Sequence, residues 1–326
     1  MANTTGYLQE IDTLTQVVQP ILKQKFYEIE NLPDYVNFDM TGEYMNTLIR
    51  GRTRMHSEKG VGFRNGSQGL AKAPSVNVSR DIISINNYAW LERIEWSTFE
   101  IEQASRGIIS FDVLAEKVES VKKRWDLDKQ DAIFAGFTEG NIGIKGLLNI
   151  DGVTSDTTII PSASTIKSLS ATQMYNFVAT ILSEYAKNSK IATMPDRFVV
   201  PLDDYLGWGN IFSADNNSGN GFNLNRSIVE YLNEMFKSMT QNPGFKILPT
   251  KYAEAETMKN LVGANVNRYV LYKKEDDALK FHIPQELRTT QIVATSGTTF
   301  SMDATGQIAG IMCGRPENLL YIDAGV

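Results

Sequence analysis

The chain contains few of the residues that carry most metal and redox chemistry. Its 326 residues include one cysteine, Cys313, and two histidines, His56 and His282. A single cysteine cannot form an intrachain disulfide, and a lone thiol fits a reducing compartment. A zinc site needs closely spaced His or Cys ligands, which this sequence does not provide. The sequence therefore predicts neither a disulfide framework nor a metal centre.

Long apolar runs and a basic excess are also missing. No apolar stretch is long enough to cross a bilayer, so no membrane contact is expected. The formal net charge is -6, whereas a dedicated nucleic-acid reader is usually basic, so sequence-specific DNA or RNA binding is not expected. Residues 1–14 lack the basic and apolar regions of a signal peptide, so none is expected.

The familiar catalytic motifs are absent as well. The sequence has no Gly-x-Ser-x-Gly elbow, and the glycines at 60, 62 and 66 miss the dinucleotide-binding spacing. Lys145 precedes Gly146, but no Ser or Thr follows as a phosphate loop requires. We therefore predict that the protein is not an enzyme, with no catalytic residue, no bound metal and no cofactor.

The first eighty residues predict elements that reach away from a core. Residues 1–50 carry a short apolar helical pattern interrupted by Pro20 and resemble an extended arm. Residues 51–80 are poor in large apolar side chains and are broken by glycines, which favours a flexible loop or a projecting two-stranded ribbon. This stretch and its border carry a positive excess, at Arg50, Arg52, Arg54, Lys59, Arg64, Lys72 and Arg80.

A long amphipathic helix is predicted over residues 110–136. Ser110 fits its N-cap, apolar residues recur every three or four positions, and Gly136 would end it. At 1.5 Å per residue the helix would be roughly 40 Å long. Its opposite face is charged, and three carboxylates on it are candidate inter-subunit contacts: Glu116, Glu119 and Asp126.

After Gly140 the chain alternates helices and strands, which predicts an α+β fold. Helices are expected over 170–188, with Ser170 and Gln173 as a capping box, and over 225–239, with Asn225 as the cap. Between them, residues 207–225 are rich in Gly and Asn and predict a loop. The last fifty residues are rich in strand-forming patterns.

The order of segments resembles that of tailed-bacteriophage major capsid proteins with the HK-ninety-seven fold. The resemblance covers about residues 90–326. The stretches that carry it are Ile94-Glu-Trp-Ser-Thr-Phe-Glu-Ile-Glu-Gln-Ala104, Asp131-Ala-Ile-Phe-Ala-Gly136, Gly143-Ile-Lys-Gly-Leu-Leu-Asn149 and Gly306-Gln-Ile-Ala-Gly-Ile-Met-Cys-Gly-Arg-Pro-Glu-Asn-Leu-Leu-Tyr321.

The resemblance implies an architecture that agrees with the pattern of elements. Residues 1–50 would be the N-arm and 51–85 an extended loop that reaches a neighbouring subunit. A peripheral domain would comprise residues 86–145 and 285–326, with the spine helix at about 110–136. An axial domain would comprise residues 146–284, with the loop 207–225 facing the symmetry axis.

The resemblance also implies function and partners. The chain would be a structural subunit that self-assembles into pentamers and hexamers of an icosahedral phage head enclosing double-stranded DNA. It would be made in the host cytoplasm and reside in the virion capsid, contacting packaged DNA without reading its sequence. Separate scaffold, portal and cement proteins are the expected partners. Some family members form Lys–Asn cross-links, for which Lys59 or Lys72 and Asn318 have suitable identities.

Two alternatives remain open from the sequence. An encapsulin-type nanocompartment shell protein would share the fold and enclose protein cargo. A soluble α+β enzyme with an unfamiliar site would leave the basic stretch 51–80 unexplained.

Overall fold

The computed structural model describes residues 25–29, 31–41, 47–57, 76–106, 112–137, 142–160, 166, 171–208 and 227–325. Several predicted features lie outside these residues: Lys59, Arg64, Lys72, Ser110, Ser170, Asn225 and most of the loop 207–225. For Arg50, Arg52, Arg54 and Arg80 only the backbone is described.

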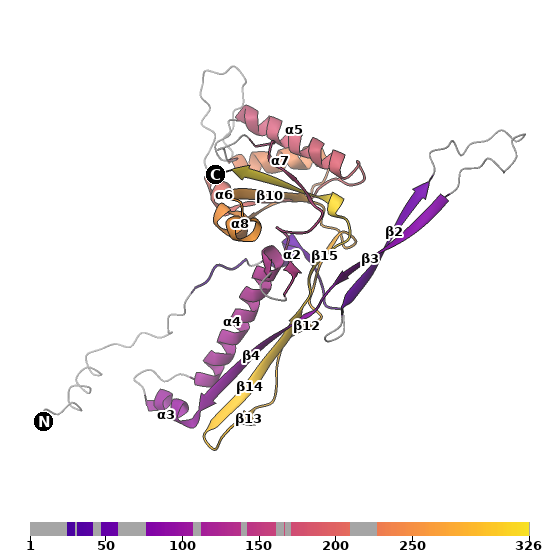
Figure 1. Ribbon diagram of the computed structural model, residues 1–326. Coiled ribbons are helices and arrows are strands. Elements are labelled where there is room, and N and C mark those ends of the chain that lie inside the picture. The colour runs from indigo at the N-terminus through magenta and orange to yellow at the C-terminus, as the bar shows by residue number, and fades with distance from the viewer. Residues whose placement is uncertain are drawn as a thin grey trace, which may run out of the picture.

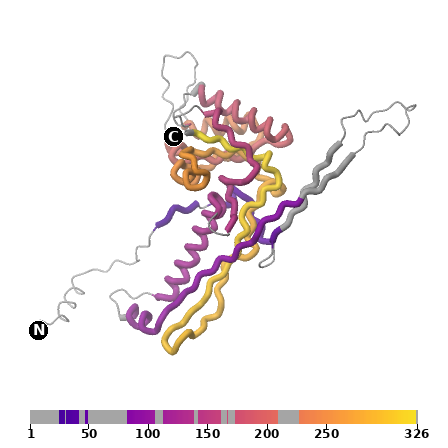
Figure 2. The backbone as a smooth tube through the Cα atoms, viewed as in Figure 1, coloured from indigo at the N-terminus to yellow at the C-terminus, as the bar shows by residue number. Residues whose placement is uncertain are grey.

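The protein has three parts, a body, a blade and a ribbon (Figure 1). The body packs helices against a sheet, the blade is a long helix beside long strands, and the ribbon is a two-stranded hairpin that extends away from both. Figure 2 shows that the blade brings together strands from opposite halves of the sequence, purple beside yellow. The structure is mixed α+β, as the sequence predicts.

The blade is built on two ten-residue strands, β4 (Tyr88–Ser97) and β14 (Thr299–Ile308), which pair antiparallel along their whole length. On the other side of β14 lie two edge strands, β12 (Gln285–Thr289) and β13 (Val293–Ala294). Side chains of a strand alternate between faces, so Ile94 and Trp96 are buried while Leu91 and Arg93 are exposed.

The buried face of the blade packs against α4 (Val113–Phe134). The 22 residues give a length of about 33 Å, shorter than expected. The N-cap is Asp112, whose Oδ1 accepts from Leu114 N and Ala115 N at 3.0 Å, so Ser110 was the wrong choice. Gly306 has no side chain where the ring of Trp125 lies, and a Cβ there would approach the ring to 2.6 Å.

The body is built on a five-stranded sheet in the order β7-β16-β10-β8-β9. Its helices α5 (Ala171–Asn188) and α7 (Ile228–Thr240) bury their apolar stripes against one face of that sheet. The strands are β7 (Thr154–Asp156), β8 (Arg197–Pro201), β9 (Lys246–Thr250), β10 (Val266–Tyr272) and β16 (Leu319–Gly325). The last strand therefore lies in the sheet of the body, not beside β4 and β14 as the predicted range 285–326 implied.

Smaller elements complete the fold. The N-cap of α7 is Ser227, which accepts from Glu230 N at 3.3 Å, so the prediction of Asn225 as the cap was wrong. The three-stranded sheet in the order β1-β11-β15 lies between body and blade. The remaining elements are α2 (Leu32–Tyr35), β1 (Asn37–Asp39), α3 (Thr98–Arg106), β5 (Gly136–Phe137), β6 (Ile144–Lys145), α6 (Leu202–Gly207), the 3₁₀ turns Lys251–Ala253 and Pro316–Asn318, α8 (Ala255–Val262), β11 (Leu279–His282) and β15 (Gly310–Cys313).

The turn after α4 joins blade to body. A helix leaves its last carbonyls without intrahelical partners. Here Leu147 N donates to Ile133 O at 2.7 Å, Leu148 N to Phe134 O at 3.1 Å, and the Asn149 amide to Ala135 O at 2.9 Å. The Asn149 Oδ1 accepts from Gly146 N at 2.7 Å, which closes the turn. The 146–149 turn therefore caps the helix with two backbone N–H groups and the Asn149 side-chain amide.

The same turn is held from the body side. Tyr321 OH donates to Leu147 O at 2.8 Å and accepts from Ile150 N at 3.0 Å. The buried Arg268 donates to Leu148 O at 2.6 Å while pairing with both oxygens of Asp323 at 2.7 and 2.8 Å. Because the donors of a buried ion pair need acceptors, the Leu148 carbonyl also stabilises the buried Arg268 by accepting from its Nη1.

Close backbone packing at this junction requires glycine. Gly136 has a φ of +70°, and a Cβ there would overlap Ile144 O. We expect Gly136→Ala to destabilise the subunit by roughly 2–4 kcal/mol, through backbone strain and displacement of the turn. Thermal unfolding of the purified subunit measures this.

The matched control is Gly297→Ala, because a Cβ at Gly297 would meet nothing within 4 Å. Its melting temperature should stay close to that of the parent. Equal melting of Gly136→Ala and the parent would contradict the role given to this glycine.

Candidate assembly surfaces

The projecting ribbon presents the first candidate surface. Strands β2 (Leu48–Ser57) and β3 (Val76–Ile85) pair antiparallel over ten residues, from Leu48 opposite Ile85 to Ser57 opposite Val76. The sequence predicted a loop or a ribbon here, and the described part is a ribbon. At its base Ile82 is 68% exposed, although isoleucine is among the residues most often buried. The ribbon thus leaves apolar surface uncovered within its own subunit.

The arginines of the ribbon occupy defined register positions. Arg50, Arg52 and Arg54 stand at alternate positions of β2, which share one face of a strand. Arg80 is paired with Thr53 and so belongs to the opposite set of positions. The predicted cluster is therefore divided, with three cationic positions together and one apart.

The three predicted carboxylates lie on α4. Glu116, Glu119 and Asp126 fall within about 80° around the helix, on one side. Asp126 accepts from Lys129 Nζ at 3.1 Å within the subunit, and Glu119 is exposed. They thus share a helix face, and whether they meet a neighbour's ribbon stays a prediction.

A second surface lies along α4, where residues 25–29 run beside the helix. The buried Gln130 accepts from Ile29 N at 2.8 Å and donates to Tyr27 O at 3.2 Å and to Tyr252 OH at 3.0 Å. Lys123 forms an ion pair with Glu28. Gln130 thus binds the backbone of residues 27–29, a role that no local sequence pattern marks.

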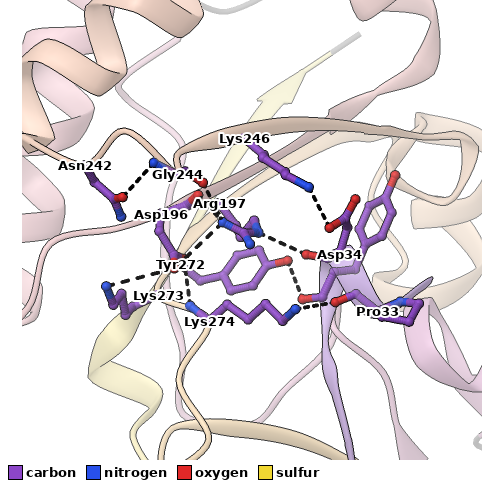
Figure 3. Close-up of polar contacts among 11 residues, drawn as sticks. Pro33, Asp34, Asp196, Arg197, Asn242, Gly244, Lys246, Tyr272, Lys273 and Lys274 are labelled. Atoms are coloured by element: carbon purple, nitrogen blue, oxygen red, sulfur yellow. Dashed lines mark hydrogen bonds and ion pairs between the residues drawn. The ribbon is translucent and has the colours of Figure 1, made fainter. Parts of the chain in front are cut away.

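The arm is anchored further by residues 33–35, shown in Figure 3. Asp34 accepts from Lys246 Nζ at 2.7 Å, and its backbone carbonyl accepts from Arg197 Nε at 3.0 Å. Tyr272 OH donates to Tyr35 O at 2.7 Å, and Lys274 Nζ donates to Pro33 O. Three of these four contacts go to main-chain carbonyls, which every residue type offers, so no sequence motif marks this anchor.

The electrostatics of the anchor favour a carboxylate at position 34. Four cations, Arg197, Lys246, Lys273 and Lys274, surround Asp34 and Asp196 (Figure 3). The hydrogen bond from Lys246 lowers the pKa of Asp34 below its ordinary value. Burial, and then the charge of Arg197, lowers the pKa of Lys274. The cationic excess therefore holds the Asp34 side chain ionised.

Asn318, named above as a candidate for cross-linking, is buried beneath the end of α5. Its Oδ1 accepts from Thr193 Oγ1 at 3.1 Å, and its backbone O accepts from Tyr185 OH at 3.1 Å. Within the described residues no group of three or more His, Cys, Asp or Glu side chains could hold a metal ion. No helix in the described part of the chain is long and apolar enough to cross a membrane.

These contacts and exposed surfaces are typical of a structural subunit. A ribbon extends away from the body and the blade with Ile82 exposed, and residues 25–36 are held against α4 and the body by contacts to both main-chain and side-chain atoms. These are the features of a structural subunit that packs against other chains.

The sequence comparison identifies the family. The profile of the family described as Major capsid protein matches residues 68–324, more than half of the chain. The chain belongs to the major capsid protein family. No curated protein sequence matches the chain.

Solved structures show the same fold. The capsid of Myoviridae phage XM1 has a TM-score of 0.74 at 18% identity, over 96% of this chain and 97% of that chain. A structure from mycobacterium phage Bobi has a TM-score of 0.57 at 11% identity, over 98% of both chains. The mature capsid of bacteriophage PhiM1 has a TM-score of 0.56 at 12% identity, over 95% of this chain and 91% of that chain.

The protein is thus a structural capsid protein that assembles with copies of itself into a virion shell. The predicted family and fold class are confirmed. The nanocompartment and enzyme alternatives are not favoured.

The stability of the Asp34–Lys246 contact depends on pH, and the lowered pKa of Asp34 sets the direction of that dependence. A lowered pKa means that the Asp34–Lys246 contact contributes fully above the ordinary carboxyl pKa of about 3.9 and is lost as the pH falls through the lowered value. Near neutral pH, Asp34→Asn should speed hydrogen exchange of residues 31–36 roughly threefold, a modest effect because the pair is partly exposed.

The difference between Asp34→Asn and the parent should vanish once the pH falls below the lowered pKa of Asp34, after correction for intrinsic exchange rates. Asp151→Asn, which removes an exposed ion pair with Lys145, is the matched control and should leave these amides unchanged. A constant difference across the whole pH range would refute the charge-based anchor.

Proposed function

We propose that the chain forms the pentamers and hexamers of an icosahedral phage head that encloses double-stranded DNA without reading its sequence. Membership of the major capsid protein family and the fold shared with phage capsids support this. The formal charge of -6 favours weak contact with DNA over tight binding. The shell performs no catalysis in this proposal, which requires neither a cofactor nor a metal.

The observation that carries the proposal is the ribbon. A two-stranded hairpin in isolation is marginally stable in water, so a projecting ribbon gains from a second surface to pack on. In a closed shell that surface is supplied by a neighbouring copy, through an interface that joins different patches on the two copies. The proposed contact pairs the arginine positions of β2 with Glu116, Glu119 and Asp126 of a neighbour.

The parts of the chain receive the following roles. Residues 1–50 form the N-arm, 51–85 the extended loop, and 86–145 with the strands of the blade form the peripheral domain. Residues 146–284 form the axial domain, to which β16 contributes a strand. The loop 207–225 is proposed to face the symmetry axis of the capsomer.

The assembly of such a shell requires other proteins. A separate scaffold protein would guide closure in the host cytoplasm, a portal would occupy one vertex, and cement proteins would bind outside. These partners are proposed from the role of the chain and not from any contact described above.

Removal of the ribbon tip tests the role of the ribbon. We expect the chain with residues 55–75 replaced by a short Gly-Ser turn to fold with an unchanged melting transition, because the described strands β2 and β3 extend away from the body (Figure 1). It should nevertheless fail to close shells in electron microscopy and light scattering, with scaffold present. Closed shells from this variant would show that the ribbon has another role.

The arginine positions test the proposed charge contact. Complementary charges set association rates more than bulk affinity. We expect the triple change Arg50→Gln, Arg52→Gln, Arg54→Gln to slow assembly about tenfold at low salt, with little difference at high salt. Light scattering over time measures the rate.

The matched control is the triple lysine variant Arg50→Lys, Arg52→Lys, Arg54→Lys, which keeps the charge. It should assemble at nearly the parent rate. Equal slowing of both triple variants would point to a need for arginine geometry and against simple charge complementarity.

A further inference from the structure

The chain has two histidines, and one of them, His282, is buried in the fold. It is the last residue of β11, the middle strand of the three-stranded sheet β1-β11-β15. Histidine is the side chain whose ordinary titration falls between about pH 5 and 8, so its charge changes near neutral pH. A buried histidine therefore links local structure to the pH wherever a charged group lies beside it.

Such a group lies on the neighbouring strand. In the parallel pairing of β1 with β11, Asp39 is opposite His282, and His282 Nδ1 lies 3.8 Å from Asp39 Oδ2. Thr41 N donates to Asp39 Oδ1 at 2.9 Å, and the Thr41 hydroxyl donates to the same oxygen. Burial of Asp39 opposes its ionisation, but these hydrogen bonds, together with the charges of His282 and Lys280, lower its pKa below the ordinary value. Asp39 therefore stays charged at every pH at which a histidine titrates.

The charges around this pair favour a proton on His282. Lys280 stands two positions earlier on β11 and so on the same face of the strand. Its Nζ lies 3.6 Å from Asp39 Oδ2 and 3.6 Å from Asp276 Oδ2, so one ammonium group is shared by two carboxylates. One negative charge is left over, and a protonated imidazole would neutralise it. Because a carboxylate within about 4–6 Å favours the charged form of histidine, this excess opposes the cost of burial.

The other elements packed on this sheet bring no competing charge among the side chains that the structure describes. On the far side of β11, β15 contains no charged residue from Gly310 to Cys313. Of the elements that contact β15, β6 carries Lys145, which is paired with Asp151 at 3.2 Å. In α4 the Asp131 carboxylate accepts from a tyrosine hydroxyl, and residues 82–85 of β3 are uncharged. The balance of charge beside His282 is therefore set by the carboxylates and the lysine named above.

The position of β1 depends on its contact with β11. β1 is the outer strand of the sheet, and of the described strands β11 alone pairs with it. Ile283 N donates to Asp39 O at 2.9 Å, while on the other side of β11 Ala309 N donates to His282 O at 3.1 Å. Soon after β1 the chain enters the ribbon, at Leu48 of β2. The contact between β1 and β11 thus fixes the point from which the chain leaves for the ribbon.

We propose that His282 and Asp39 form a proton-controlled latch that holds β1, and with it the start of the ribbon, on the three-stranded sheet. A proton on His282 completes a charged pair with Asp39 across the two strands. Because the pair favours the proton in the folded subunit, its stabilising contribution is complete below the ordinary histidine value of about 6.5. The contribution is lost as the pH rises through the higher value of the folded subunit. The inference goes beyond the proposed function, because it concerns the single subunit.

An NMR titration of the imidazole tests the charged pair. The unassembled chain carries His56→Gln, so that His282 gives the one imidazole signal. We expect the further change Asp39→Asn to lower the titration midpoint by about one pH unit, which is tenfold weaker proton binding. The matched control, Asp303→Asn, removes an exposed carboxylate paired with Arg93 in the blade and should leave the midpoint unchanged. Equal midpoints with and without Asp39→Asn would overturn the latch.

Hydrogen exchange of two amides tests the effect on β1. The Ile283 amide is protected by Asp39 O, and the Ala309 amide, protected by His282 O, is the internal control. After correction for intrinsic rates, exchange of the Ile283 amide should become up to about tenfold faster between about pH 5.5 and pH 8, the limit set by a one-unit difference in proton affinity. The Ala309 amide should change little, and Asp39→Asn should abolish the pH dependence. Protection of the Ile283 amide that stays constant or rises with pH would contradict the proposal.

A second variant covers the case in which Asp39→Asn does not fold. His282→Gln keeps a polar side chain at this position and removes the titrating group, so it should also abolish the pH dependence of the Ile283 amide. A pH dependence that persists in His282→Gln would assign the effect to another group and refute the latch. Both measurements use the unassembled chain, so their outcome does not depend on whether shells form.

Discussion

The structure depends on how α4 ends. Three carbonyls at its C-terminus would lack partners, and the 146–149 turn supplies all three donors, two from main-chain N–H groups and one from the Asn149 amide. These donors reach the helix only because Gly136 and Gly146 allow the backbones to touch. Since Tyr321 and Arg268 bind the same turn from the sheet of the body, the direction of the blade is fixed relative to the body.

This junction explains the glycine-rich pattern of residues 131–149, which marks the end of the long helix in the sequence. Asp131 to Gly136 and Gly143 to Asn149 could be identified from the sequence because a helix stop, two glycines and an Asn leave a readable pattern. The alternation along β4, the stripes of α5 and α7 and the α+β class could be predicted for the same reason. Each follows from side-chain periodicity, which is local.

The features that could not be predicted from the sequence are contacts to main-chain groups of residues far apart in the chain. The arm is held by donors to the carbonyls of Pro33, Asp34 and Tyr35, and any residue type offers a carbonyl. No local pattern in the sequence indicates that Tyr27 and Ile29 lie against Gln130. β16 was assigned by its place in sequence, whereas pairing with β10 is decided by burial of Leu320 and Ile322 in the body. The predicted N-caps of α4 and α7 were each wrong by two residues, because several neighbouring polar residues could cap each helix.

The C-terminal stretch connects the three sheets of the molecule. Between Thr299 and Gly325 the chain passes through the blade as β14, the small sheet as β15 and the body as β16. A sharp change of direction occurs at Gly310, whose φ of +93° a side chain would oppose. Each sheet is therefore tied to the next by one short connection as well as by packing. Surfaces at the end of the blade and on the body consequently keep a fixed relation within one subunit.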